Sequence, residues 1–186
     1  MQNDRGDSRA GLTDELLAIR CQLGEGDAFT ELVERWHPPM LRYLRRMTDD
    51  DEADDLGQEV WLRVLRAMPG LRDPARLRPW LFGIARRTLM DRLRRRYAAP
   101  LSVPVDEADL ATPAPDDLTE DLLDMHDALG RLPPVEREVL VLFYLRELSL
   151  EQLAELLAIP AGTVKSRLHR ARRLLRHQLS DRETQS

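Results

Sequence analysis

Residues 98–127 limit what this chain can fold into more than any other segment. They contain four prolines, nine Asp or Glu residues and no Lys or Arg. A stretch of this composition buries too little apolar surface to fold alone, and its prolines favour extended backbone. We therefore expect an acidic linker over residues 98–117, with one small folded domain on each side of it. A chain of 186 residues has room for two such domains.

The segments on both sides of this linker have helical patterns. Aromatic residues make up only 5% of the chain, and good helix formers such as Leu, Ala, Arg and Glu dominate the periodic stretches. The helical periodicity predicts four or five helices in residues 13–97 and a second helical domain in residues 118–180. We expect disorder in residues 1–12 and a short tail at 181–186. The predicted fold class is all-α, with two small helical domains joined by an acidic, proline-containing flexible linker.

Prolines mark the expected breaks between helices. Pro38 and Pro39 fall inside a helical pattern, where proline removes a backbone donor and clashes with the preceding turn, so we expect a break or kink there. A loop is expected from Pro69 to Pro79. In the second domain, helices are expected at about 117–130, 134–146, 150–157 and 161–178.

A short capped helix, a turn and a basic helix end the second domain. Ser149 stands three residues before Gln152, which has the form of a capping box and predicts a helix that begins at residue 150. A tight turn containing Pro160 then leads into a longer helix, and this order is that of a helix-turn-helix. The pattern predicts a DNA-binding fold.

The last helix concentrates positive charge. Residues 160–182 contain seven Lys or Arg and one acidic residue, although the whole chain has a net charge of −5. A charge run alone would indicate only a solvated helix, but the capped helix and turn before it favour DNA binding. Such a helix directs its first turns at base edges, and its later cations contact phosphates. The predicted DNA contacts are Thr163, Lys165, Ser166, Arg167, His169, Arg170 and Arg173.

The first domain contains two clusters of opposite charge. Residues 49–59 hold seven carboxylates and no cation, which exceeds what a helix N-terminus requires and favours a basic protein partner. Residues 86–97 have a net charge of +5, on an amphipathic helix whose arginines suit phosphates or splayed bases.

Four motifs occur in this order along the chain: D-D-L-x-Q-E-V-W at 54–61, W-L-x-x-I-A at 80–85, D-x-L-R-R at 91–95 and P-x-G-T-V-K-S-R-L-H-R-A-R at 160–172. Together they resemble the extracytoplasmic-function group of bacterial RNA polymerase sigma factors, from about Asp27 to Leu179. The resemblance implies two DNA-binding domains, called regions 2 and 4 in that family.

The resemblance implies a role for each cluster. Asp55, Gln58 and Glu59 fall on the motif that docks on the clamp helices of the polymerase β′ subunit. Region 4 is expected to bind the minus-thirty-five element as duplex and to contact the β flap. The resemblance implies that the acidic linker follows the RNA exit path, whereas its charge alone favours a plain solvated spacer. An anti-sigma factor is the further expected partner. The loop from Pro69 to Pro79 is implied in contact with the melted minus-ten element, together with Trp80, Arg86, Arg87, Asp91, Arg94 and Arg95.

Arg87 departs from the family pattern. Many members have Asn at this position, and that residue helps to read a flipped base. We therefore expect an unusual or less stringent minus-ten preference.

The sequence offers no site for catalysis. It contains neither of the phosphate-binding glycine motifs G-x-x-x-x-G-K-[ST] and G-x-G-x-x-G. One cysteine and four scattered histidines exclude a Cys-based zinc site. We expect no enzymatic activity, no cofactor or metal and no small-molecule substrate. The longest apolar run, Val139 to Leu145, is too short to span a bilayer, so we expect a cytoplasmic protein.

A free-standing helix-turn-helix regulator is the alternative. The last sixty residues would suit such a protein equally well. The first 97 residues discriminate, because a regulator would have a receiver, ligand pocket or dimerisation helix there instead of an acidic docking face and a second basic helix.

Overall fold

The computed structural model describes residues 4–48, 50–98, 127–144 and 148–183, and all regular elements in these ranges are helices. The first group contains α1 (Asp4–Gln22), α2 (Ala28–Arg45), α3 (Asp50–Ala67), the short 3-10 helices η1 (Met68–Gly70) and η2 (Pro74–Arg76), and α4 (Leu77–Ala98). The second contains α6 (Pro134–Tyr144), α7 (Leu150–Leu157) and α8 (Ala161–Glu183). The predicted all-α class is confirmed.

Part of the sequence prediction falls on residues 99–126. This range includes nearly all of the expected linker and most of the helix expected at about 117–130, and it lies outside the described residues. Residues 127–130 are helical. None of the helices in the described part of the chain is both long and apolar enough to cross a membrane.

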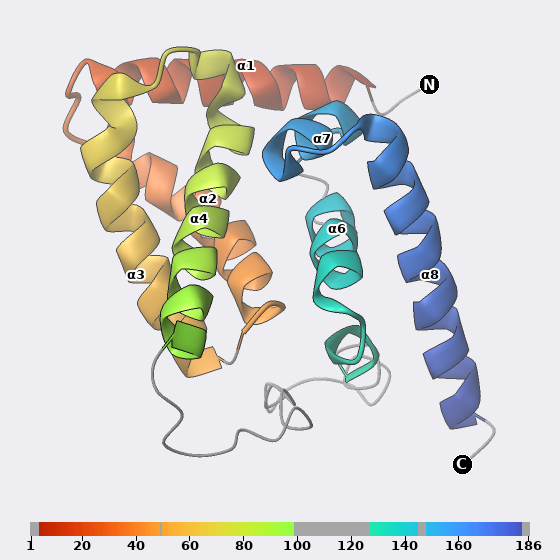
Figure 1. The fold of residues 1–186 in the computed structure, drawn as a ribbon. Helices are drawn as coiled ribbons and strands as arrows, with labels where there is room; N and C mark the ends of the chain where they lie inside the picture. The colour runs from red at the N-terminus through yellow and green to blue at the C-terminus, as the bar shows by residue number, and fades with distance from the viewer. Residues whose placement is uncertain (1–3, 49, 99–126, 145–147, 184–186) are drawn as a thin grey trace.

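The first group packs around aromatic side chains. Helices α2, α3 and α4 stand side by side, and α1 lies across one end of them (Figure 1). Phe82 of α4 is buried and meets Trp36 and Tyr43 of α2 edge to face, with ring centroids 6.3 and 6.0 Å apart. Each such pair contributes about 0.5–1.5 kcal/mol beyond the burial of its area. These contacts fix α4 against α2.

Helix α2 continues through Pro38 and Pro39, so the expected break does not occur there. Proline deprives the carbonyl group four residues earlier of its helical partner, and those carbonyl groups belong to Glu34 and Arg35. Both residues are exposed, so water can replace the lost bonds. Buried residues on both sides of the prolines, among them Trp36 and Met40, hold the helix in one piece.

Helix α1 begins at Asp4, well before Thr13. Most of the segment 1–12, for which the sequence predicts disorder, is therefore helical in the structure. No proline interrupts it, and the acidic residues Asp4 and Asp7 favour a helix N-terminus through the helix dipole. The same helix is attached to the bundle by buried Asp14, which pairs with Arg35 and Arg78 at 2.6 Å each.

The second group is the helix-turn-helix that the sequence predicts. The backbone N–H of Gln152 donates to Ser149 Oγ at 3.2 Å, and the backbone N–H of Ser149 donates to Gln152 Oε1 at 2.8 Å, which completes the capping box. Helix α7 is terminated by the C-cap residue Ala158, whose φ of 53° is left-handed. Helix α8 begins at the expected residue and continues to Glu183.

Replacing Ser149 by Ala should lower the free energy of unfolding by about 1 kcal/mol, because an N-cap hydroxyl satisfies an otherwise unpaired backbone donor. The measurement is urea denaturation followed by circular dichroism. The matched control is Ser166→Ala, since that exposed hydroxyl only donates back to the Thr163 carbonyl at 3.0 Å within α8. Equal losses in the two variants would contradict a special role for the cap.

The two groups of helices pack on each other. Their buried apolar residues form one continuous cluster, and α7 lies against α4. A Cβ built on Gly83 of α4 would stand 3.6 Å from Leu156 Cδ1 of α7, which is an ordinary van der Waals distance, so the two helices lie in contact here and would accommodate a methyl group. The Tyr43 hydroxyl group of α2 donates to Glu138 Oε1 of α6 at 3.1 Å. Residues far apart in the sequence are thus joined in one body.

Candidate nucleic-acid interface

Helix α8 separates a buried face from a basic one. Val164, Leu168 and Ala171 are buried against the rest of the second group. Of the predicted DNA contacts on the same helix, five are exposed and two are half-buried. The exposed residues are Lys165, Ser166, His169, Arg170 and Arg173, and the half-buried residues are Thr163 and Arg167. The structure therefore places all seven off the buried stripe of the helix that follows the turn, with Thr163 and Arg167 at its edge.

Two arginines of α8 also contact α6. Arg170 Nε lies 3.4 Å from the buried Glu136 Oε1. Arg172 Nε donates to the Tyr144 hydroxyl oxygen at 3.0 Å, and its guanidinium lies 5.3 Å from the centre of the Phe143 ring. Such stacking is favourable by about 0.5–1 kcal/mol at exposed sites. Arg172 therefore fixes α8 to α6.

A cleft lies between η1, η2, α4 and α7. Its volume is about 590 Å³, and Trp80, Arg86 and Arg87 are among its lining residues. Arg72 and Arg76 also line it; they belong to the Pro69 to Pro79 loop that the resemblance implies in strand contact, although the prediction did not single them out. Their signal in the sequence was the positive charge of the Pro69 to Pro79 loop. Four guanidinium groups beside an indole ring suit the binding of phosphates and stacked bases.

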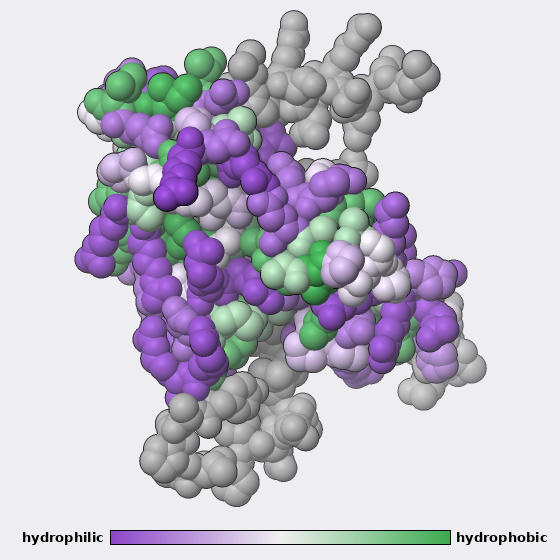
Figure 2. Space-filling view, turned by 45° about the horizontal axis from the view of Figure 1, so that its top comes forward, coloured by the Kyte–Doolittle hydropathy of each residue, from purple (hydrophilic) through white to green (hydrophobic). Residues whose placement is uncertain are grey.

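Helix α7 closes one side of this cleft. Glu155 of α7 forms an ion pair with Arg76 across it, and Leu156 lies among its lining residues. Helices α1 and α7 lie on the face that Figure 2 brings forward, where hydrophilic side chains predominate and apolar groups stand between them.

Arg86 is partly withdrawn from solvent. Its Nε donates to Glu138 Oε1 at 2.9 Å and its Nη2 to Glu138 Oε2 at 3.3 Å. The Glu138 side chain is only 8% exposed, and it also accepts the Tyr43 hydroxyl. Burial, followed by the charge of Glu138, raises the pKa of Tyr43. The carboxylate Glu138, which the site prediction did not include, therefore occupies the donors of one predicted strand-binding arginine.

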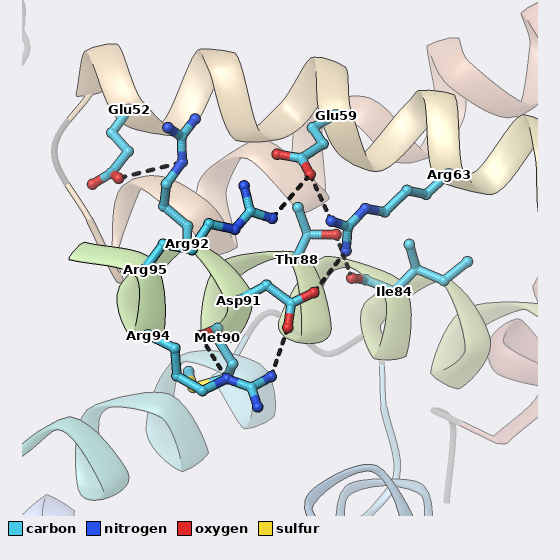
Figure 3. A network of polar contacts seen from close by, with 10 residues as sticks. All are labelled: Glu52, Glu59, Arg63, Ile84, Thr88, Met90, Asp91, Arg92, Arg94 and Arg95. Carbon is cyan, nitrogen blue, oxygen red and sulfur yellow. Dashed lines mark hydrogen bonds and ion pairs between the residues drawn. The ribbon is translucent and has the colours of Figure 1, made fainter. Parts of the chain in front are cut away.

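The remaining predicted strand contacts lie along α4, from Trp80 near its start to Arg95 near its end. Arg87, Arg94 and Arg95 are exposed, whereas Trp80 and Asp91 are half-buried. Asp91 accepts Arg63 Nη1 at 3.1 Å and Arg94 Nη2 at 2.6 Å (Figure 3). The hydrogen bond from Arg63 is the main cause that lowers the pKa of Asp91, with Arg94 contributing.

The acidic side of α3 carries the three residues expected to dock a protein. Asp55 and Gln58 are exposed. Glu59 is half-buried and pairs with Arg63 at 2.6 Å. Leu62 and Leu65 follow on the same helix with exposed fractions of 54% and 52%. A polar patch and an apolar patch are thus adjacent, which is typical of protein interfaces.

In the part of the chain that the structure describes, no group of three or more His, Cys, Asp or Glu side chains is arranged to hold a metal ion. Cys21 is a half-buried thiol whose pKa is raised by burial.

Comparison with known proteins relates both helical groups to one family. The family model described as Sigma-70 region 2 matches residues 32–98, and the one described as Sigma-70, region 4 matches residues 122–175. The ECF RNA polymerase sigma factor SigW of Bacillus subtilis (strain 168) is 32% identical over 172 residues, which cover 85% of this chain and 92% of SigW. RNA polymerase sigma factor CarQ of Myxococcus xanthus is 35% identical over 164 residues, with 86% and 94% covered.

Solved structures share the fold. CnrH in complex with the cytosolic domain of CnrY is 26% identical, with a TM-score of 0.68 over 90% of this chain and 97% of that one. The sigma factor RpoE from Bartonella quintana, in complex with the anti-sigma factor NepR, is 24% identical, with a TM-score of 0.66 over 83% and 98%.

Proposed function

Because this chain belongs to the extracytoplasmic-function group of RNA polymerase sigma factors, we propose that each of its two helical groups recognises one promoter element. Its function is that of the family: it binds core polymerase and directs promoter recognition, DNA melting and transcription initiation. Residues 13–97 act as region 2, and residues 118–180 act as region 4. Polymerase performs the phosphodiester chemistry, and the sigma factor itself is not an enzyme. Its place of action is the cytoplasm, where polymerase works.

Polymerase docks on the acidic side of α3. Asp55 and Gln58 are exposed there, and Glu59 stands one position further along. This face carries negative charge and would repel DNA, but it complements the cationic surface of a protein partner. The clamp helices of the β′ subunit are the proposed contact. The β flap is the proposed contact of region 4.

The melted minus-ten strand lies along α4. Arg87, Arg94 and Arg95 are exposed for phosphate contact, and Trp80 lines the cleft in which a base can stack. Arg72 and Arg76 extend this set to the loop before α4. Arg86 can contact the strand only after the hydrogen bonds between its guanidinium and Glu138 are broken. Arg87 stands where many relatives have Asn, which supports an altered minus-ten preference.

The minus-thirty-five element is read by α8 in the major groove. Lys165, Ser166 and His169 are exposed near the start of the helix, where base edges are reached, and Arg173 is placed further along for phosphate. One weak contact per domain becomes useful when polymerase fixes the separation of the two, since the second contact is then intramolecular. Free protein therefore binds promoter DNA poorly.

An anti-sigma factor is the proposed regulator. The solved relatives described above were captured with CnrY and with the anti-sigma factor NepR. A partner that covers the docking face and the basic helices would keep this protein from polymerase and DNA until it is released.

The observation that supports this function best is the presence of two basic helices, α4 and α8, in one chain with a separate acidic face. The test is run-off transcription with purified core polymerase that lacks other sigma factors, on the promoter upstream of this gene. A discrete transcript is expected. Sequence-specific DNA binding by the protein alone, without a transcript, would favour a free-standing helix-turn-helix regulator.

Replacing Lys165 by Ala should reduce discrimination at the minus-thirty-five element by about 1–3 kcal/mol if Lys165 contacts a base. Replacing Arg173 by Ala should weaken binding to all sequences alike and flatten the slope of log affinity against log salt by about one unit, as loss of a phosphate contact does. Holoenzyme binding to matched and mismatched duplexes over a salt series measures both effects. An Arg173 variant with altered sequence preference would reverse the assignment.

A further inference from the structure

Arg63 stands between the acidic side of α3 and the basic end of α4, and it contacts a carboxylate of each helix. Its Nη2 donates to Glu59 Oε1 at 2.6 Å, and its Nη1 donates to Asp91 Oδ2 at 3.1 Å. Figure 3 shows this guanidinium between the two helices. One side chain therefore joins a residue of the proposed docking face to a residue of the proposed strand-binding helix.

Two strand-binding arginines depend on the same carboxylates. Arg94 Nη2 donates to Asp91 Oδ1 at 2.6 Å, and Arg95 Nη2 lies 3.9 Å from Glu59 Oε1 (Figure 3). Any change in how Glu59 and Asp91 share Arg63 alters the attraction that each exerts on its second arginine. The charge of Glu59 at the docking face is thus linked to how strongly the side chains of Arg94 and Arg95 are held in place.

Partial burial makes this link stronger than a surface ion pair. The side chains of Glu59 and Arg63 are each 32% exposed, and that of Asp91 is 35% exposed. Pairs at such sites are screened less by salt than fully exposed pairs. A simple intrahelical pair would account for Arg63 and Glu59, which are four residues apart. It does not account for the second bond, across the helix interface to Asp91.

We propose that Arg63 is a positioning residue that couples polymerase docking to strand binding. The inference rests on the proposed function, which assigns docking to α3 and strand contact to α4. A cationic group of polymerase at Glu59 competes with Arg63 and Arg95 for one carboxylate. Arg95 is then released and can contact phosphate. Arg63, having lost Glu59, pairs with Asp91 alone, and this stronger pairing weakens the hold of Asp91 on Arg94. Docking thereby prepares the basic end of α4 for the melted strand.

Single-stranded DNA binding by the full chain without polymerase tests the coupling. Glu59→Gln removes the charge that polymerase would neutralise, and Asp55→Asn is its matched control, with the same charge change on the same helix. Fluorescence anisotropy of a labelled single-stranded oligonucleotide at low ionic strength reports the affinity. We expect Glu59→Gln to tighten binding about three- to fivefold, and Asp55→Asn by less than about twofold, as loss of one surface charge gives.

The same comparison in an Arg63→Met background separates coupling from long-range electrostatics. We expect the effect of Glu59→Gln to shrink there, because only the direct release of Arg95 remains, and to recover in part with Arg63→Lys, because lysine keeps the charge but reaches one carboxylate at a time. Equal effects of Glu59→Gln and Asp55→Asn in the parent chain would overturn the proposal, and that comparison does not depend on how Arg63→Met folds. An unchanged Glu59→Gln effect in folded Arg63→Met would also overturn it.

Run-off transcription with the unmodified protein distinguishes the two failures. A transcript together with either overturning result refutes the coupling alone. Absence of a transcript refutes the proposed function, and the coupling with it.

Discussion

Run-off transcription should fall to background when Asp55 and Gln58 are both replaced by Arg. Both side chains are exposed on α3, so the double substitution should leave the fold intact and oppose a cationic partner surface. Like charges brought together across an interface cost several kcal/mol, and about 3 kcal/mol corresponds to a loss of affinity of more than a hundredfold. Co-purification with core polymerase and run-off transcription measure the two consequences.

This variant keeps Glu59, because its half-buried carboxylate pairs with Arg63 and its replacement would also break that pair. The matched control is Asp51→Arg, which reverses an exposed charge in the first turns of the same helix. Thermal unfolding of both variants should resemble that of the parent chain. Polymerase binding that survives Asp55→Arg with Gln58→Arg would place the docking face elsewhere on the molecule.

Replacing Glu138 by Ala should lower the free energy of unfolding by about 2–3 kcal/mol. This single buried carboxylate accepts hydrogen bonds from Tyr43 and Arg86, which belong to the first group of helices. Its removal leaves a buried hydroxyl and a partly buried cation without their partner, and breaking a buried pair costs about 3–5 kcal/mol. We take a smaller value because the Arg86 side chain is 31% exposed. Urea denaturation measures the change.

Tyr43→Phe provides the comparison for this variant. It removes only the hydroxyl group and should cost about 1 kcal/mol. If Glu138→Ala costs no more than Tyr43→Phe, the pair between Glu138 and Arg86 adds nothing to the packing of the two groups of helices.

Local features of the structure could be predicted well from the sequence. The capping box at Ser149 and Gln152 predicts where α7 begins, and the turn with Pro160 predicts where α8 begins, because each depends on residues a few positions apart. The buried face of α8 follows from the helical spacing of Val164, Leu168 and Ala171. Five of the seven predicted DNA contacts are accordingly exposed, and Thr163 and Arg167 lie half-buried at the edge of the buried face.

Contacts between distant segments could not be predicted in this way. Arg86 and Glu138 are 52 positions apart, and neither helical period nor charge pattern indicates that they meet. The sequence predicts one basic cluster of arginines on α4, yet Arg86 pairs with Glu138 of α6 while Arg94 is hydrogen-bonded to Asp91. The continuation of α2 through Pro38 likewise depends on buried residues on both sides of it, so local propensity gave the wrong expectation of a break.

The contact of Arg172 with Phe143 and Tyr144 bears on the entropy of DNA binding. Because this stack joins α8 to α6 within the free protein, the angle between these two helices is set before a duplex arrives. If the proposed contacts Lys165 and His169 meet the duplex, association has to immobilise their exposed side chains, at about 0.5–1.5 kcal/mol for each long one, and no helix has to be reoriented. The helix pair α6 and α8 is therefore preorganised for DNA. Differences in affinity among promoters are expected to arise from the base contacts themselves.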